Sequence, residues 1–176
     1  QDGCNQFCTY CIIPFARGRV RSRAKSDVIR EVKELAANGY QEVVLTGIHL
    51  SSYGVDLEGE DLLSLILAVN EIDGIKRIRL GSLEPRIITE EFAKTISRLE
   101  KMCPHFHLSL QSGCEETLKR MNRHYTPQEL KIRYEALVSG KEEVQRGLLN
   151  TKNLGKKDDM HESHPEIKIE EVFRSL

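Results

Sequence analysis

Apolar positions in the first part of the chain follow two different spacings in turn. Val28, Val32 and Leu35 recur at helical spacing within residues 24–38, which predicts a helix with one apolar face. Residues 42–46 form a short β-branched run, a pattern that is typical of a strand buried on both faces. We therefore expect the N-terminal loop to be followed by a helix and then by a strand.

The alternation continues further along the chain. We expect helix, strand, helix, strand and two more helices over residues 61–69, 75–80, 89–102, 105–110, 117–121 and 127–138. Strands that alternate with helices are typical of βαβ units, and crossovers between parallel strands are almost always right-handed. The predicted fold class is therefore α/β, with a parallel sheet that either fans open or curls toward a barrel.

The pattern changes after residue 138. Residues 139–176 contain a charged run at residues 156–159 and no apolar run that resembles a strand. A segment of this composition buries too little apolar surface to pack well. We therefore predict a folded core over residues 1–138 and a charged, poorly packed segment over residues 139–176.

The charge balance and hydropathy exclude some classes of protein. The 176 residues contain 26 Lys and Arg against 27 Asp and Glu, so bulk positive charge does not drive nucleic-acid binding, although a local basic patch remains compatible. No apolar run reaches the roughly 18 residues of a membrane-spanning helix, and no secretion signal opens the chain. These features predict a cytoplasmic protein with no membrane partner.

The five cysteines are unevenly distributed along the chain. Cys4, Cys8 and Cys11 form a C-x3-C-x2-C pattern, whereas Cys103 and Cys114 lie far downstream. An odd, clustered set without a secretion signal favours a metal site over a disulfide framework. We expect Cys103 and Cys114 to be small buried residues rather than ligands.

Two kinds of inorganic centre are compatible with three clustered thiolates. A structural zinc ion requires four ligands, usually as two separated pairs, and no second pair stands at a suitable spacing. A cubane iron–sulfur cluster held by three cysteines leaves one iron without a protein ligand. That iron can chelate S-adenosylmethionine, and an electron from the cluster can then cleave the sulfur–carbon bond to give a 5′-deoxyadenosyl radical. A non-catalytic zinc-binding module remains the alternative.

Several motifs resemble those of a known family. The cysteine pattern, with Tyr10 directly before the last cysteine, resembles the signature of the radical S-adenosylmethionine (radical SAM) superfamily. Longer strings are similar to those of the methylthiotransferases that modify tRNA, at residues 2–14, 17–23, 45–54, 79–85, 107–113 and 118–126. Within that family, Thr-Gly-Ile-His-Leu at residues 46–50 is most similar to the branch that acts on N6-threonylcarbamoyladenosine at position 37 of tRNA.

The resemblance implies a fold, an activity and partners. The fold would be a partial parallel β/α barrel of the radical SAM type, truncated at both ends and preceded by a domain that holds a second [4Fe-4S] cluster. The activity would be transfer of a methylthio group to C2 of the modified adenosine, with tRNA as the substrate and flavodoxin or ferredoxin as the electron donor. Another tRNA base or a ribosomal protein remains an alternative substrate. We expect the 176-residue chain alone to be catalytically incompetent.

The resemblance also assigns site residues, none of them as a catalytic acid or base. Cys4, Cys8 and Cys11 would hold a [4Fe-4S] cluster. The residues expected to bind S-adenosylmethionine lie in the cysteine loop and at the carboxyl ends of strands, where parallel α/β sheets bind ligands: Tyr10, Gly47, Ser82, Glu84, Ser109 and Gln111. The residues expected to bind RNA phosphates are the alternating Arg17, Arg19, Arg21 and Arg23. The alternative for the four polar residues after strands is a helix cap or a loop contact, and for Gly47 it is an ordinary glycine between a strand and a loop. The alternative for the arginines is a solvated basic loop.

Overall fold

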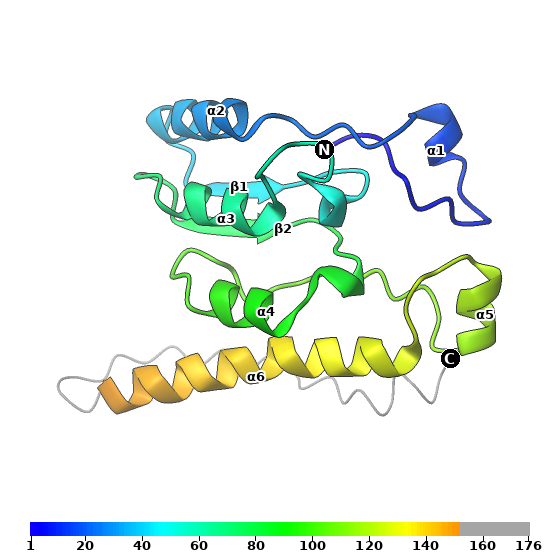
Figure 1. The fold of residues 1–176 in the computed structure, drawn as a ribbon. Helices are drawn as coiled ribbons and strands as arrows, with labels where there is room; N and C mark the ends of the chain where they lie inside the picture. Colours follow the sequence, from blue (N-terminus) through cyan, green and yellow to red (C-terminus); the bar gives the residue numbers. More distant parts are fainter. Residues whose placement is uncertain (152–176) are drawn as a thin grey trace.

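Helices and short strands alternate along the part of the chain that the computed structural model describes, residues 1–151 (Figure 1). Side chains are described as far as residue 139. In chain order the elements are α1 (Ile13–Ala16), α2 (Lys25–Ala37), β1 (Glu42–Leu45), the short 3-10 helix η1 (Leu50–Ser52), α3 (Leu62–Asn70), β2 (Arg77–Leu80), the short 3-10 helix η2 (Pro85–Ile87), α4 (Glu90–Ser97), α5 (Glu115–Arg120) and α6 (Pro127–Thr151). The predicted mixture of helices and parallel strands is confirmed.

The strands β1 and β2 form a βαβ unit with α3. They pair in parallel with Leu45 opposite Leu80, and both of these side chains are buried. α3 begins at Asp61, whose carboxylate accepts a 2.7 Å hydrogen bond from the Ser64 N–H, while the Ser64 hydroxyl lies 3.3 Å from the Asp61 N–H. This reciprocal cap satisfies backbone donors that the first turn of a helix leaves free, and it fixes where the crossover helix starts.

The small sheet buries one face only. In both strands buried positions alternate with more exposed ones: Val44 of β1 is 51% exposed, and Arg77 of β2 is exposed. The expectation that the first strand is buried on both faces is therefore wrong. In Figure 1, α2 lies near β1, and α4 lies beyond β2 with α6 running along it. The core joins the sheet and the helices through buried side chains such as Val32 of α2, Ile66 of α3 and Ile96 of α4. The strands point toward the end of the molecule where α1 and α5 lie (Figure 1). The carboxyl ends of the strands therefore face the cysteine loop.

The predicted third strand at residues 105–110 is wrong in its extent. The chain there runs parallel to β2, but it pairs at only two places, where Met102 lies opposite Ile78 and Leu108 lies opposite Leu83. Between the two pairings the His105 N–H donates to Cys103 O at 2.8 Å rather than to β2, so the ladder is interrupted there. Within residues 1–151 the regular sheet therefore has two strands, and its extension into a barrel stays a prediction.

Two helices differ in length from their predictions. α4 ends at Ser97 rather than near residue 102, because the following residues turn to pair with β2, where the Ile78 N–H donates to Lys101 O at 2.7 Å. α6 continues past residue 138 to Thr151, so the predicted boundary of the core falls inside a helix. Residues 152–176, the rest of the predicted charged segment, lie outside the described residues. No helix within residues 1–151 is both long and apolar enough to cross a membrane.

Candidate iron–sulfur site

The cysteine loop is closed at its base. Asp2 and Arg21 pair in the antiparallel manner, with N–H to O distances of 2.9 and 2.8 Å, and the Arg21 guanidinium also donates to the Asp2 carboxylate at 2.9 Å. Gly3 has a φ of +67°, and a Cβ there would lie 1.9 Å from the Arg19 carbonyl oxygen. Only glycine fits this close approach. The Asp2–Arg21 pairing and the contact at Gly3 together fix both ends of the loop that residues 2–21 form.

The three thiols of this loop are free and close enough to interact electrostatically. Cys4 and Cys8 are buried, and Cys11 is partly exposed. Burial raises the pKa of the Cys4 thiol; the Gln6 N–H, 3.5 Å from Cys4 Sγ, opposes the rise, and negative charge on Cys8 and Cys11 adds to it. Among the described residues, no three side chains of His, Cys, Asp or Glu are arranged so that they could hold a metal ion. Positive charge placed between these sulfurs would relieve their mutual repulsion.

A turn after α5 holds the cysteine loop from the other side. The Asn122 side-chain amide donates to the carbonyls of Phe7 at 3.0 Å and Gln6 at 3.3 Å. The Thr9 N–H donates to Met121 O at 3.2 Å. Phe7 and Asn122 have φ values of 50° and 56°, and a left-handed backbone is unusual for a bulky residue such as Phe7. Backbone strain of this kind is typical of functional sites and persists because the surrounding contacts enforce it.

Arg123 contacts the cysteine loop through a sulfur. Its Nη1 donates to Cys8 Sγ at 3.4 Å, and its Nη2 donates to Ser109 O at 3.4 Å. The guanidinium carbon lies 5.2 Å from the centre of the Tyr125 ring, and the Tyr125 hydroxyl donates to Leu110 O at 2.5 Å. Burial works to lower the pKa of Arg123, but the interactions with Cys8 and Tyr125 raise it overall. A charged guanidinium therefore lies beside one of the candidate ligands.

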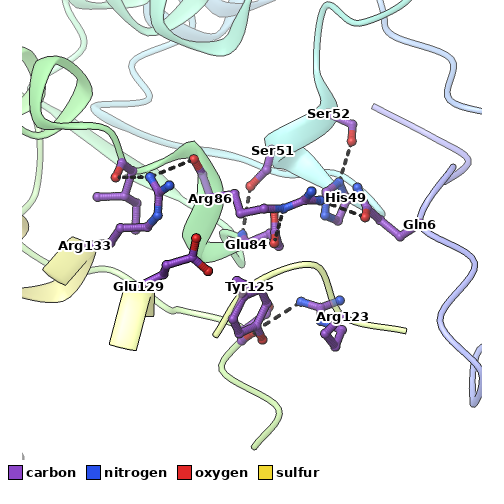
Figure 2. Close-up of polar contacts among 12 residues, drawn as sticks. Gln6, His49, Ser51, Ser52, Glu84, Arg86, Arg123, Tyr125, Glu129 and Arg133 are labelled. Atoms are coloured by element: carbon purple, nitrogen blue, oxygen red, sulfur yellow. Dashed lines mark hydrogen bonds and ion pairs between the residues drawn. The ribbon is translucent and has the colours of Figure 1, made fainter. Parts of the chain in front are cut away.

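A second polar cluster lies beyond the carboxyl end of β2 (Figure 2). Glu84 is 5% exposed and accepts two hydrogen bonds from Arg86 Nε, at 2.8 and 3.1 Å, while its N–H donates to Ser51 Oγ. Arg86 Nη2 donates to Gln6 Oε1 at 2.9 Å, and Arg133 of α6 donates to Arg86 O at 3.1 Å. The cluster thus joins the cysteine loop to the loops after both strands and to α6.

His49 lies next to this cluster with an unsatisfied nitrogen (Figure 2). Its Nδ1 lies 2.6 Å from Ser52 Oγ, whereas its Nε2 is buried without a hydrogen-bond partner. Burial lowers the pKa of His49, which favours the neutral ring. A buried polar atom without a partner is costly unless a ligand or water satisfies it, and Asn70 Oδ1, Arg123 Nε and Arg133 Nε share this condition.

The predicted cofactor residues after β2 and near residue 110 have different surroundings. Glu84 and Ser109 both belong to the polar contacts already described, Ser109 through its backbone carbonyl. Ser82 is exposed, with its hydroxyl 2.6 Å from His107 Nδ1. Gln111 is also exposed and has a φ of 65°. Their binding of S-adenosylmethionine stays a prediction.

Gly47 and Tyr10 complete the set of predicted cofactor residues. A Cβ at Gly47 would lie 2.8 Å from Gln1 Oε1, so Gln1 by itself already explains why a side chain is excluded there. Tyr10 is 54% exposed. Partial burial raises the pKa of Tyr10, and negative charge on Cys8 raises it further. The phenol therefore lies close enough to Cys8, a candidate ligand, to interact with it. The expectation that Cys103 and Cys114 are buried is wrong, since Cys103 is only partly buried and Cys114 is exposed at the start of α5.

The predicted RNA-binding residues Arg17, Arg19, Arg21 and Arg23 do not share one kind of surrounding. Arg17 and Arg21 both approach the carboxylate of Asp2, at 3.8 and 2.9 Å. Arg23 forms an ion pair with Glu31, and the Arg19 guanidinium lies 4.9 Å from the centre of the Phe7 ring. The three side chains in ion pairs are more than half exposed. Contacts with RNA therefore remain a prediction for a surface that is partly neutralised by its own acids.

Sequence reasoning did not assign a role to Gln6, Arg86, Asn122 or Arg123. The string at residues 118–126 carried the family resemblance, but nothing in its spacing indicates that Asn122 touches Gln6, 116 positions earlier. One local signal was available, because asparagine followed a short predicted helix, and asparagine is among the few residues that tolerate a left-handed backbone there. The contacts themselves depend on the tertiary fold.

The fold and the site together define a class of protein. Three free thiols, two of them receiving N–H···S hydrogen bonds, lie on a loop that faces the carboxyl ends of two parallel strands, and cysteine sulfurs with N–H donors of this kind are typical ligands of iron–sulfur clusters. The chain belongs to the radical SAM superfamily, whose family model matches residues 1–144.

Curated relatives narrow this classification. A tRNA-2-methylthio-N(6)-dimethylallyladenosine synthase of Clostridium tetani is 48% identical over 124 residues, which are 70% of this chain and 27% of the relative. The threonylcarbamoyladenosine tRNA methylthiotransferase MtaB of Aquifex aeolicus is 48% identical over 139 residues, which are 79% of this chain and 33% of the relative. These matches confirm the recognition of the radical SAM methylthiotransferases. The chain spans between about a quarter and a third of the length of these relatives.

The residues present fit the cofactors of this family, which uses S-adenosylmethionine and [4Fe-4S] clusters. Thiolates are the protein ligands of such clusters, and N–H groups directed at their sulfurs are the usual outer contacts. Both features occur here, since Gln6 and Arg123 donate toward Cys4 and Cys8.

Proposed function

We propose that this chain is the cofactor-binding part of a tRNA methylthiotransferase that adds a methylthio group at C2 of N6-threonylcarbamoyladenosine 37. The observation that carries the proposal is the fixed cysteine loop, in which Cys4, Cys8 and Cys11 lie on one closed turn of chain and two of the three sulfurs receive N–H donors. The same residues occur in a region that is about half identical to curated tRNA methylthiotransferases.

The residues of the chain would position the cofactors rather than carry out acid or base chemistry. When bound, a [4Fe-4S] cluster with S-adenosylmethionine supplies reductive cleavage of the sulfur–carbon bond and hence a radical. Cys4, Cys8 and Cys11 hold the cluster in this proposal, and Glu84 and Ser109 would bind polar groups of S-adenosylmethionine. The contacts of Asn122 and Arg123 keep the loop in the shape that loading requires, so little reorganisation is needed on binding.

The choice of modified base is supported by polarity. A threonylcarbamoyl group carries a carboxylate and a hydroxyl, whereas a dimethylallyl group is apolar. The guanidinium groups of Arg86 and Arg123 already have partners in the chain, whereas His49 Nε2 is buried without one (Figure 2). A polar substituent could satisfy that nitrogen, whereas an apolar one would leave it without a partner. The similarity to MtaB, and the resemblance of residues 46–50 to that branch, support the same choice.

A second candidate substrate is N6-dimethylallyladenosine, because the names of several curated relatives specify it. Mass spectrometry of tRNA nucleosides from a strain lacking the gene separates the two. We expect loss of the 2-methylthio derivative of N6-threonylcarbamoyladenosine and accumulation of its unmodified precursor. Loss of the dimethylallyl derivative instead transfers the assignment to the second candidate, and an unchanged level of both contradicts the proposal.

A further inference from the structure

Arg123 is the one cationic side chain of the described residues that donates a hydrogen bond to a cysteine sulfur. Its Nη1 lies 3.4 Å from Cys8 Sγ, while its Nη2 donates to Ser109 O at the same distance. The planar guanidinium also lies against the ring of Tyr125, which is 4% exposed. Three contacts of different kinds therefore fix the orientation of one charged group.

Tyr125 in turn is anchored to the chain near the carboxyl end of the sheet. Its hydroxyl lies 2.5 Å from Leu110 O and 2.9 Å from Ser109 O. Because an anchored aromatic ring supports the guanidinium, Arg123 cannot swing into solvent without losing all of these contacts together. The position of the charge beside Cys8 is thus set by packing rather than by the flexibility of an exposed side chain.

We propose that Arg123 is a positioning residue for the cluster, whose N–H···S contact with Cys8 makes the bound cluster easier to reduce. This inference rests on the proposed function, in that Cys8 must be a cluster ligand. The reduced cluster carries one more negative charge than the oxidised one, so a fixed positive charge and a hydrogen bond at a ligand sulfur stabilise the reduced form more. Charge and hydrogen bonds at the sulfurs are among the factors that set cluster potentials.

The contact requires arginine rather than any cation. A lysine ammonium retains the charge, but it lacks the planar fork that reaches two acceptors while stacking on an aromatic ring. We therefore expect Arg123→Lys to have an intermediate effect and Arg123→Met the full effect. Arg120→Met is the matched control. Arg120 is an exposed arginine at the end of α5, so this substitution removes a guanidinium from the same region and leaves the contact with Cys8 intact.

The test is a redox titration of the four proteins after anaerobic reconstitution with iron and sulfide, followed by electron paramagnetic resonance of the reduced cluster. At the midpoint potential of the unsubstituted chain, we expect Arg123→Met to lower the ratio of reduced to oxidised cluster about tenfold, which is about 59 mV for one electron. Arg120→Met leaves the ratio unchanged. A change that only loosened the fold would lower the amount of cluster and not its potential.

Each outcome decides the proposal. Equal potentials for Arg123→Met and the unsubstituted chain, at equal iron content, overturn it. If Arg123→Met binds no iron, Arg123→Lys decides, since a lowered ratio supports the proposal and an unchanged one overturns it. If the unsubstituted chain binds no iron, the assignment of the cluster site is overturned, and this inference with it. If iron content is normal and the potentials are unchanged, only the role of Arg123 is overturned.

Discussion

Replacing Asn122 tests whether the turn after α5 holds the cysteine loop in place. The Asn122 amide donates two hydrogen bonds, to Phe7 O and Gln6 O, and each is worth about 1 kcal/mol. Its φ of 56° adds a second effect, because alanine in a left-handed conformation costs about 1 to 2 kcal/mol and glycine costs little. Asn122→Gly should therefore weaken the attachment of the loop by about 2 kcal/mol, and Asn122→Ala by about 3 to 4 kcal/mol.

Hydrogen exchange at the Thr9 amide measures this attachment directly. That N–H donates to Met121 O, so it exchanges when the loop separates from the turn. About 2 kcal/mol corresponds to roughly thirtyfold faster exchange in Asn122→Gly, and Asn122→Ala should exchange faster again by about a factor of ten. The Cys103 amide, which donates to Ile78 O beside the sheet, serves as the internal control. Unchanged exchange at Thr9 in both variants refutes the attachment, and equal rates in the two variants refute the strain.

Three further predictions concern the surroundings of the site. Gly3→Ala places a Cβ 1.9 Å from Arg19 O, so the loop should open and Cys4 should be alkylated faster, which mass spectrometry detects; an unchanged rate contradicts the fit. Burial and Glu60 raise the pKa of Tyr53 to about 12, so its contribution to stability is complete below about pH 10 and lost between about pH 10 and 12. Urea unfolding should show that loss in the unsubstituted chain and not in Tyr53→Phe. Alanine at the four exposed arginines should weaken binding of tRNA and reduce its salt dependence, and an unchanged salt slope argues against phosphate contacts at Arg17, Arg19, Arg21 and Arg23.

The spacing of apolar residues alone was sufficient to predict most of the helices and strands. Residues such as Val32, with apolar neighbours at helical spacing, face the core as a one-sided helix requires, and the short β-branched run became β1. The prediction failed where the chain depends on a distant partner. Leu108 has strand-like neighbours, but the His105 N–H bonds to Cys103 O instead of to β2, and only the approach to β2 decides which residues pair.

The candidate site was likewise predictable only where its residues are close together in the sequence. The spacing of the three cysteines is local, so it could be recognised from the sequence together with the family resemblance. Asn122 and Arg123 act on the loop from more than a hundred positions away, at separations of 116 and 115 residues, and no periodic pattern carries that information. Glu84 could be proposed from its place after a strand, whereas its pairing with Arg86 and the link onward to Gln6 depend on side-chain geometry.

The central claim is that the cysteine loop binds an iron–sulfur cluster, and metal analysis after anaerobic reconstitution tests it most directly. We expect equal amounts of iron and acid-labile sulfide, in the proportions of a [4Fe-4S] cluster, with visible absorption that disappears when Cys4, Cys8 and Cys11 are replaced by serine. The double replacement of Cys103 and Cys114 by serine, both outside the loop of residues 2–21, should leave both unchanged. Binding of zinc without iron–sulfur absorption, or retention of the cluster by the triple serine variant, would contradict the account.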